Sequence, residues 1–142
     1  MTREISVSLL QDWKLVYDAI KNDLKPKTIF LMSGDLGSGK TTFINFVCEA
    51  NQIPLSASPT YSIIHEYNNE NLKIIHVDLY RLETEDEIIS SGFWDILSNE
   101  KSIIFVEWPS RISDQDWPLD WSIVEINIDL IGQDRRVRIV NR

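Results

Sequence analysis

The sequence predicts one α/β domain over residues 1–142, built in three layers around a mixed, mainly parallel central sheet with antiparallel flanking strands. Three observations predict it. Through the middle of the chain, strongly apolar stretches that suit buried strands alternate with stretches of helical spacing. The C-terminal stretch instead alternates apolar and polar residues, as an antiparallel hairpin does. A length of 142 residues provides for one hydrophobic core but not for two.

A helix and a buried strand are expected near the N-terminus. After a short alternating strand at EISVSL, apolar residues recur at helical spacing over residues 9–24, and Pro26 ends this helix. Residues 27–32, KTIFLM, have the apolar and partly β-branched composition of a strand that is buried on both faces. A glycine-rich segment follows this strand directly.

This segment, GDLGSGKTTF, has the pattern and the context of a phosphate-binding loop. It fits G-x-x-x-x-G-K-T, it follows a buried strand, and residues 40–50 after it have helical spacing. In such a loop, backbone amides at the helix N-terminus surround a polyphosphate, the lysine reaches the β and γ phosphates, and the first threonine binds Mg²⁺. The residues predicted to bind ATP and Mg²⁺ are Gly34, Asp35, Leu36, Gly37, Ser38, Gly39, Lys40, Thr41 and Thr42.

Strands and helices continue to alternate after the loop, which is the layout of a three-layer P-loop NTPase fold. The expected elements are a loop at 51–62, strands at 61–67 and 72–80 joined by the turn NNEN, a helix at 83–98 interrupted by Gly92, a strand at 101–108, and a hairpin at 120–142 that turns at IGQD.

Two carboxylates follow buried strands, at the edge where open parallel sheets bind ligands. Asp78 comes after KIIHV, and Glu107 comes after SIIFV. Each could bind Mg²⁺ or position water for phosphoryl transfer, or could instead cap the next helix or pair with Arg81 or Arg111. Two such acids at one edge favour a functional role for at least one of them.

Charge and cysteine content narrow the class of protein. A formal net charge of −8 argues against a DNA-binding or RNA-binding face, because such faces need an excess of basic residues. The single cysteine, Cys48, fits a small buried apolar residue and a reducing compartment. The sequence has no apolar run of membrane length and no signal-peptide pattern, so we expect a cytoplasmic protein.

The loop and four further segments together resemble the bacterial TsaE family. GDLGSGKTTF, SPTYSIIHEY, HVDLYRL, SGFWDIL and VEWPSR have the order and spacing of this family over about residues 5–140. The resemblance implies a small P-loop ATPase that binds TsaD and TsaB, the proteins that place a threonylcarbamoyl group on adenosine 37 of tRNAs reading codons that begin with A. It implies contact with tRNA only through that complex, and neither a membrane nor DNA as a partner.

The resemblance also implies roles for individual residues. Asp78 and Glu107 would be the metal-binding and water-activating carboxylates, and Trp108, which by itself fits the core, would flank the nucleotide. Thr60 in SPTY would sense the γ-phosphate as a switch threonine, although by its residues alone it fits a turn or cap hydroxyl. The loop residues that would line the phosphates are Gly37, Gly39, Lys40, Thr41 and Thr42, with Lys40 catalytic and Thr41 also on Mg²⁺.

Two tryptophans near the C-terminus and the two histidines are given no role in binding or catalysis. Trp117 and Trp121 flank PLD in a stretch expected to be exposed, where they fit hydrophobic anchors of the hairpin better than a partner-docking patch. His65 and His76 lie on predicted strands without a cysteine or an acid at metal-ligand spacing, so we predict no metal site there.

Two other functions would use the same loop. A small P-loop kinase that phosphorylates a small molecule or nucleoside would also bind ATP and Mg²⁺, but it needs an acceptor site and usually an arginine-rich lid, and neither is evident in the sequence. A nucleotide-binding scaffold without turnover would need only the loop.

Overall fold

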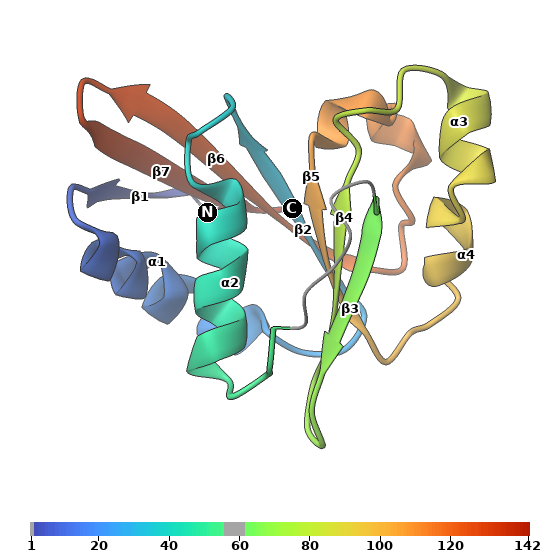
Figure 1. Ribbon diagram of the computed structural model, residues 1–142, viewed down its shortest axis with the longest axis horizontal. Coiled ribbons are helices and arrows are strands. Elements are labelled where there is room, and N and C mark those ends of the chain that lie inside the picture. The colour runs from blue at the N-terminus through green and yellow to red at the C-terminus, as the bar shows by residue number, and fades with distance from the viewer. Residues whose placement is uncertain (1, 56–61) are drawn as a thin grey trace.

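The computed structural model describes residues 2–55 and 62–142, and within them seven strands form one sheet in the order β1-β7-β6-β2-β5-β4-β3 (Figure 1). The strands are β1 (Thr2–Val7), β2 (Thr28–Gly34), β3 (Ile64–Asn68), β4 (Lys73–Asp78), β5 (Ile103–Glu107), β6 (Ser122–Ile131) and β7 (Asp134–Asn141). The helices are α1 (Trp13–Ile20), α2 (Lys40–Ala50), α3 (Glu85–Ser90) and α4 (Phe93–Ile96), with 3₁₀ turns at Leu10–Asp12, Lys21–Asp23, Pro109–Arg111 and Asp114–Asp116. No helix of this described part is long and apolar enough to cross a membrane.

The centre of the sheet is parallel and its flanks are antiparallel. β6, β2, β5 and β4 are neighbours in that order and run in the same direction. β3 pairs antiparallel with β4 at one edge, and β7 and β1 pair antiparallel at the other. The predicted mixed sheet is therefore confirmed, and the carboxyl ends of β2, β4 and β5 lie together at one edge.

Helices cover both faces of this sheet, because alternate residues of the central strands enter two separate cores. One core joins the sheet to α1 and α2, and in it the rings of Phe30 and Phe105 stack with their centroids 4.6 Å apart. The other joins the opposite face to α3 and α4 through side chains such as Ile88 and Phe93. The result is the predicted three-layer arrangement, with α1 and α2 on one side and α3 and α4 on the other (Figure 1).

Several local expectations are confirmed. α2 spans the residues that the apolar spacing predicts. Gly92 adopts a φ of +86° between α3 and α4, which is a left-handed conformation that interrupts the helix. Cys48 is buried in the α2 core, and burial raises the pKa of its thiol to about 11, which makes it an inert apolar residue.

The expected exposure of the stretch around Trp117 and Trp121 is wrong for both tryptophans. Their side chains are only 4% and 6% exposed, and the ring of Trp117 packs edge-on against Phe93 with a centroid distance of 6.0 Å. Leu119, between them, is fully exposed. The two indoles anchor the start of the hairpin in the core that contains Phe93, as the favoured interpretation predicts, so they do not form a docking patch.

Trp117→Ala should lower the free energy of unfolding by about 3–5 kcal/mol, because it removes a large buried side chain and leaves a cavity. Urea unfolding followed by circular dichroism measures this change. Leu119→Ala is the matched control and should change the free energy by less than about 0.5 kcal/mol. Equal, small changes in the two variants would contradict the core position of Trp117.

Candidate nucleotide-binding site

The glycine-rich loop connects the end of β2 to the start of α2 at the carboxyl edge of the sheet (Figure 1). Gly34 is the last residue of β2 and Lys40 the first of α2. Gly39, between them, has a φ of +111°, and a Cβ there would lie 2.5 Å from a ring carbon of Trp13. A larger residue at this position would have to displace the tryptophan, so the tight turn into α2 depends on this glycine.

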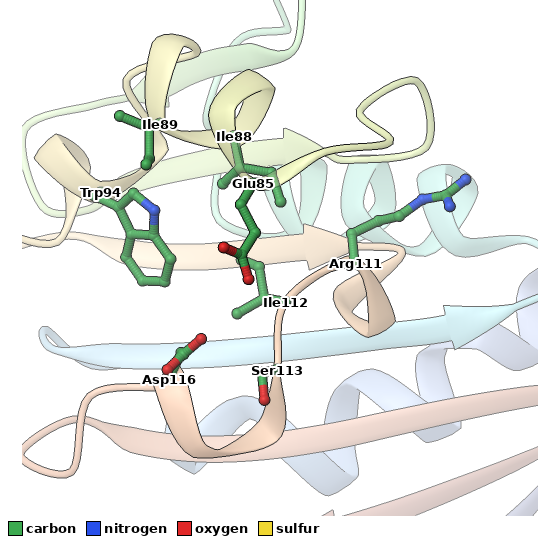
Figure 2. A pocket seen from close by; sticks show the side chains of 8 residues that line it. All are labelled: Glu85, Ile88, Ile89, Trp94, Arg111, Ile112, Ser113 and Asp116. Atoms are coloured by element: carbon green, nitrogen blue, oxygen red, sulfur yellow. The ribbon is translucent and has the colours of Figure 1, made fainter.

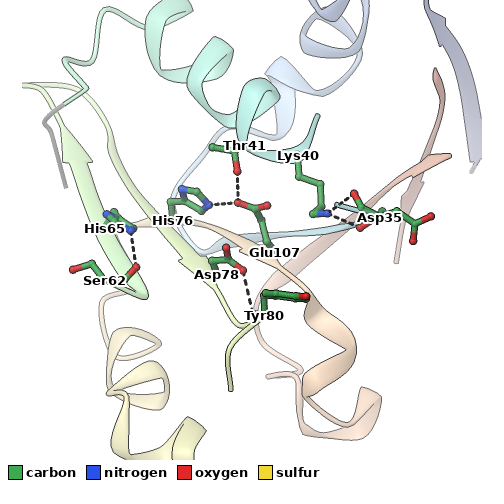
Figure 3. A network of polar contacts seen from close by, with 10 residues as sticks. Asp35, Lys40, Thr41, Ser62, His65, His76, Asp78, Tyr80 and Glu107 are labelled. Atoms are coloured by element: carbon green, nitrogen blue, oxygen red, sulfur yellow. Dashed lines mark hydrogen bonds and ion pairs between the residues drawn. The ribbon is translucent and has the colours of Figure 1, made fainter. Parts of the chain in front are cut away.

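Lys40 is buried with its ammonium group inside the loop (Figure 3). Its Nζ donates hydrogen bonds to the carbonyl oxygens of Gly34 at 2.5 Å and Asp35 at 3.1 Å, and lies 4.8 Å from the ring centroid of Trp108. Burial lowers the pKa of Lys40, while nearby carboxylates, Glu107 first among them, act in the opposite direction. The loop thus fixes its cation at the N-terminus of α2, where a polyphosphate would bind.

Glu107 ends β5 as a buried carboxylate with two side-chain partners (Figure 3). Its Oε2 accepts a hydrogen bond from Thr41 Oγ1 at 2.8 Å and lies 2.5 Å from His76 Nε2. Burial alone would raise the pKa of Glu107, but the hydrogen bonds from His76 and Thr41 and the charges of His76 and Lys40 outweigh it and hold the pKa below its usual value. An ionised acid therefore contacts the threonine that is predicted to bind Mg²⁺.

Asp78 lies beside Glu107, because the two residues are in register across β4 and β5 and residues in register on parallel strands face the same side of the sheet. It is the more exposed of the two acids, and its Oδ1 accepts a hydrogen bond from the backbone nitrogen of Tyr80 at 3.1 Å. Both predicted carboxylates therefore face the loop at one edge of the sheet.

These groups line one open cavity of about 250 Å³. Its lining contains residues 36–42 of the loop together with Asp78, Glu107 and Trp108. Gly34 and Asp35, the first two residues of the loop, do not line the cavity, and their carbonyl groups accept hydrogen bonds from Lys40. The predicted site residues thus come together, except that Thr60 lies outside the described residues.

Trp108 occupies a left-handed conformation, with φ +60° and ψ +50°, immediately after Glu107. This conformation is rare for a bulky side chain and costs roughly 1–3 kcal/mol. The indole ring packs against Tyr80, with centroids 4.9 Å apart, and against the ammonium group of Lys40. The residue therefore forms part of the cavity wall as well as part of the packing beneath it.

His76 is a site residue that the sequence did not reveal. The spacing along the sequence did not predict its contact with Glu107, which forms because residues 76 and 78 face the same side of β4 and Glu107 lies on the adjacent strand. His65 differs, since its Nε2 lies 3.0 Å from the backbone oxygen of Ser62. The sequence signal that could have revealed His76 as a site residue was its two-residue spacing from Asp78 on the same strand.

Arg135 is a second site residue found only in the structure. From β7 its Nε donates to the carbonyl oxygen of Ser38 at 2.6 Å and its Nη2 to that of Gly37 at 3.3 Å. Strand alternation directs it inward, whereas Arg136 and Arg138 are exposed. A second cation therefore lines the cavity, held by the backbone of the loop.

A separate cavity lies between α3, α4 and the segment after β5 (Figure 2). Its lining includes Ile88, Trp94 and Arg111, and it shares no lining residue with the loop cavity. Arg111 extends away from the other side chains in Figure 2 and donates to the backbone oxygen of Tyr80 at 2.9 Å, so it is not the partner of Glu107. This cavity offers no acceptor site next to the loop, and it lends no support to the kinase alternative.

Comparison with known proteins identifies the family. A family model described as "Threonylcarbamoyl adenosine biosynthesis protein TsaE" matches residues 9–138. The chain belongs to the TsaE family. The resemblance seen in the sequence is thereby confirmed, and with it membership in a family of tRNA threonylcarbamoyladenosine biosynthesis.

Individual members of the TsaE family match most of the chain. The TsaE protein of Borreliella burgdorferi is 37% identical over 111 residues, which are 78% of this chain and 80% of that protein. The TsaE protein of Aquifex aeolicus is 32% identical over 147 residues, covering 100% of this chain and 98% of that protein. The crystal structure of Bacillus subtilis YdiB has the same fold, with a TM-score of 0.74 over 98% of this chain and 84% of that one at 24% identity.

His76→Ala should raise the pKa of Glu107, because it removes the hydrogen bond and the charge that lower the pKa while the burial remains. Carbon-13 NMR of the side-chain carboxyl groups, recorded against pH without nucleotide or metal, measures the shift. Lys101→Ala, at an exposed lysine outside the cavity, is the control and should leave the titration of Glu107 unchanged. Superimposable Glu107 titrations in the wild type and in His76→Ala would contradict the interaction.

Proposed function

We propose that this chain is an ATPase that binds ATP and Mg²⁺ at the glycine-rich loop and acts with TsaD and TsaB in the threonylcarbamoylation of adenosine 37 in tRNAs reading codons that begin with A. The observation that carries the proposal is the hydrogen bond between Thr41 and Glu107, which joins the loop to an ionised carboxylate. Membership in the TsaE family supports a role in threonylcarbamoyladenosine biosynthesis. The contact between Thr41 and Glu107 supports Mg²⁺-dependent ATP hydrolysis.

The loop would hold the phosphates by charge and by backbone donors. The backbone amides at the N-terminus of α2 would donate to the phosphates, and the helix dipole favours an anion there. Lys40 would exchange its hydrogen bonds with the carbonyls of Gly34 and Asp35 for hydrogen bonds with the β and γ phosphates. Because the ammonium group of Lys40 already lies inside the loop, it would need to move little to reach the phosphates.

The oxygen atoms at this edge suit Mg²⁺. Within residues 2–55 and 62–142 no group of three or more His, Cys, Asp or Glu side chains could hold a metal ion, which agrees with a Mg²⁺ ion held by one or two protein oxygens and the phosphates. Thr41 and Glu107 would bind the ion, which supplies positive charge to the phosphate oxygens. Asp78, beside them and more exposed, would orient the attacking water.

An activating partner is part of the proposal because the site is open. Arg111 is engaged by the backbone of Tyr80, and Arg135 by the backbone of the loop. A charge supplied by a partner can raise the rate of phosphoryl transfer by about 10³–10⁵. We therefore expect slow ATP hydrolysis by the isolated chain and faster hydrolysis when TsaD and TsaB cover the site.

Lys40→Ala should weaken ATP binding by about 2–4 kcal/mol, since it removes a desolvated charge that faces the phosphates. Calorimetric titration with ATP and Mg²⁺ measures the affinity, and circular dichroism checks the fold. Lys101→Ala changes an exposed lysine outside the cavity and should bind as the wild type does. Wild-type affinity in a folded Lys40→Ala protein would refute the assignment of the phosphate site.

Addition of a TsaD–TsaB complex should increase the rate of phosphate release from ATP. Steady-state phosphate release is measured at fixed enzyme concentration across a titration of the complex. The Lys40→Ala protein, mixed with the same complex, gives the background rate of phosphate release. A rate that stays flat to saturating complex would exclude activation by these partners.

A further inference from the structure

The cavity between α3, α4 and the segment after β5 combines buried apolar side chains with exposed acids (Figure 2). Its volume is about 190 Å³, which is smaller than the roughly 300–1,000 Å³ of a typical small-molecule site and suits one long side chain. We propose that this cavity receives a lysine or arginine side chain of the protein complex that activates the chain, an inference that rests on the proposed function.

The inner wall of the cavity is apolar. Ile88 of α3 and Ile112 of the segment after β5 are only 4% and 6% exposed, and the half-buried indole of Trp94 lies beside them. Trp94 packs edge-on against Phe93, with ring centroids 5.1 Å apart, which fixes its orientation. The methylene stem of a lysine or arginine packs well on such a surface, and its cationic group is attracted to the face of an indole.

Two exposed carboxylates line the cavity from opposite sides. Glu85 comes from the first turn of α3, and Asp116 comes from the 3₁₀ turn Asp114–Asp116 (Figure 2). Within residues 2–55 and 62–142, no cation forms an ion pair with either of these side chains. An acid in the first turn stabilises a helix, which accounts for Glu85 but not for Asp116. The cavity therefore presents uncompensated negative charge beside its apolar wall.

Arg111 also lines the cavity, but its charge is directed elsewhere. Its Nη2 donates to the backbone oxygen of Tyr80 at 2.9 Å, and the side chain extends away from Glu85 and Asp116 (Figure 2). A cation from another molecule would complement the two acids. Lysine and arginine are the side chains that join an apolar stem to a positive charge, so they match both parts of the cavity.

The segment that contains Arg111 separates this cavity from the loop cavity. Arg111 ends the 3₁₀ turn Pro109–Arg111, which directly follows Trp108. Trp108 lines the loop cavity, and its ring packs against that of Tyr80 with centroids 4.9 Å apart. A partner that covers the open loop cavity can therefore cross this segment and place one basic side chain in the neighbouring cavity.

Removal of the two charges tests the docking site. Glu85→Gln/Asp116→Asn should weaken binding of the TsaD–TsaB complex by about tenfold or more, because the cation of the partner loses the charges that compensate it. Biolayer interferometry with ATP and Mg²⁺ present measures the affinity. Asp86→Asn/Asp95→Asn is the matched control, since it removes two exposed charges from α3 and α4 outside the cavity and should stay within about twofold of the wild type.

Phosphate release separates docking from catalysis. Glu85→Gln/Asp116→Asn should need about tenfold more complex for half-maximal stimulation, in proportion to its weaker binding, and should reach the maximal rate of the wild type. Its affinity for ATP, measured by calorimetry without the complex, should be unchanged, because the two cavities share no lining residue. A lower maximal rate with an unchanged half-saturating concentration would overturn the docking role, because the acids would then act on the active site.

A second variant blocks the cavity without removing an acid. Ile89 lines the cavity and is 61% exposed, so the side chain introduced by Ile89→Arg can occupy the space beside Glu85 from within the chain. This variant should also weaken binding of the complex by about tenfold or more. Leu119→Arg, at the fully exposed leucine outside this cavity, should bind as the wild type does. Thermal unfolding checks the fold of each variant.

The outcomes separate this inference from the proposed function. If the complex binds and activates the wild type, and binds Glu85→Gln/Asp116→Asn equally well, the docking site falls and the proposed function stands. Equal weakening in Asp86→Asn/Asp95→Asn also overturns the docking site, because the effect then depends on net charge. Normal binding of the complex with loss of calorimetric spermidine binding would assign the cavity to a free cation instead. A wild type that does not bind the complex overturns the proposed partner and this inference with it.

Discussion

The hydrogen bond between Thr41 and Glu107 connects the glycine-rich loop and α2 to the carboxylate at the end of β5. Thr41 belongs to the first turn of α2, and Glu107 ends β5, the strand next to β2 in the sheet. A buried carboxylate is stable as an anion only when donors satisfy it, and Thr41 and His76 are the donors here. The contact therefore fixes the start of α2 over the carboxyl edge of the sheet and keeps a negative charge beside the loop that would bind the phosphates.

The parallel centre of the sheet explains why so few residues suffice for this site. β2, β4 and β5 end at the same edge, so the loop after β2 and the acids at the ends of β4 and β5 meet without long insertions. The antiparallel hairpin adds β7 on the far side of β6, and from there Arg135 reaches the back of the loop. The loop thus has an acidic side, next to Asp78 and Glu107, and a basic side, next to Arg135.

The sequence predicts those features that depend on one segment at a time. The apolar strands, the bounds of α2, and the acids at the ends of β4 and β5 follow from local composition and spacing. The partners of His76 and Arg135 do not, because they depend on which strands are neighbours and in what register. The stretch around Trp117 was expected to be exposed because it is short and has no periodicity that separates an inward from an outward side chain. The switch role of Thr60 stays a prediction.

The central claim is that the loop and the carboxylate edge form one site for a triphosphate and its metal ion. A crystal structure with a non-hydrolysable ATP analogue and Mn²⁺ in place of Mg²⁺ tests it most directly, because anomalous scattering locates the manganese ion. We expect manganese within about 2.2 Å of Thr41 Oγ1, with phosphate oxygens and a carboxylate of this edge in its ligand shell. Manganese and triphosphate bound away from Thr41 would contradict the account.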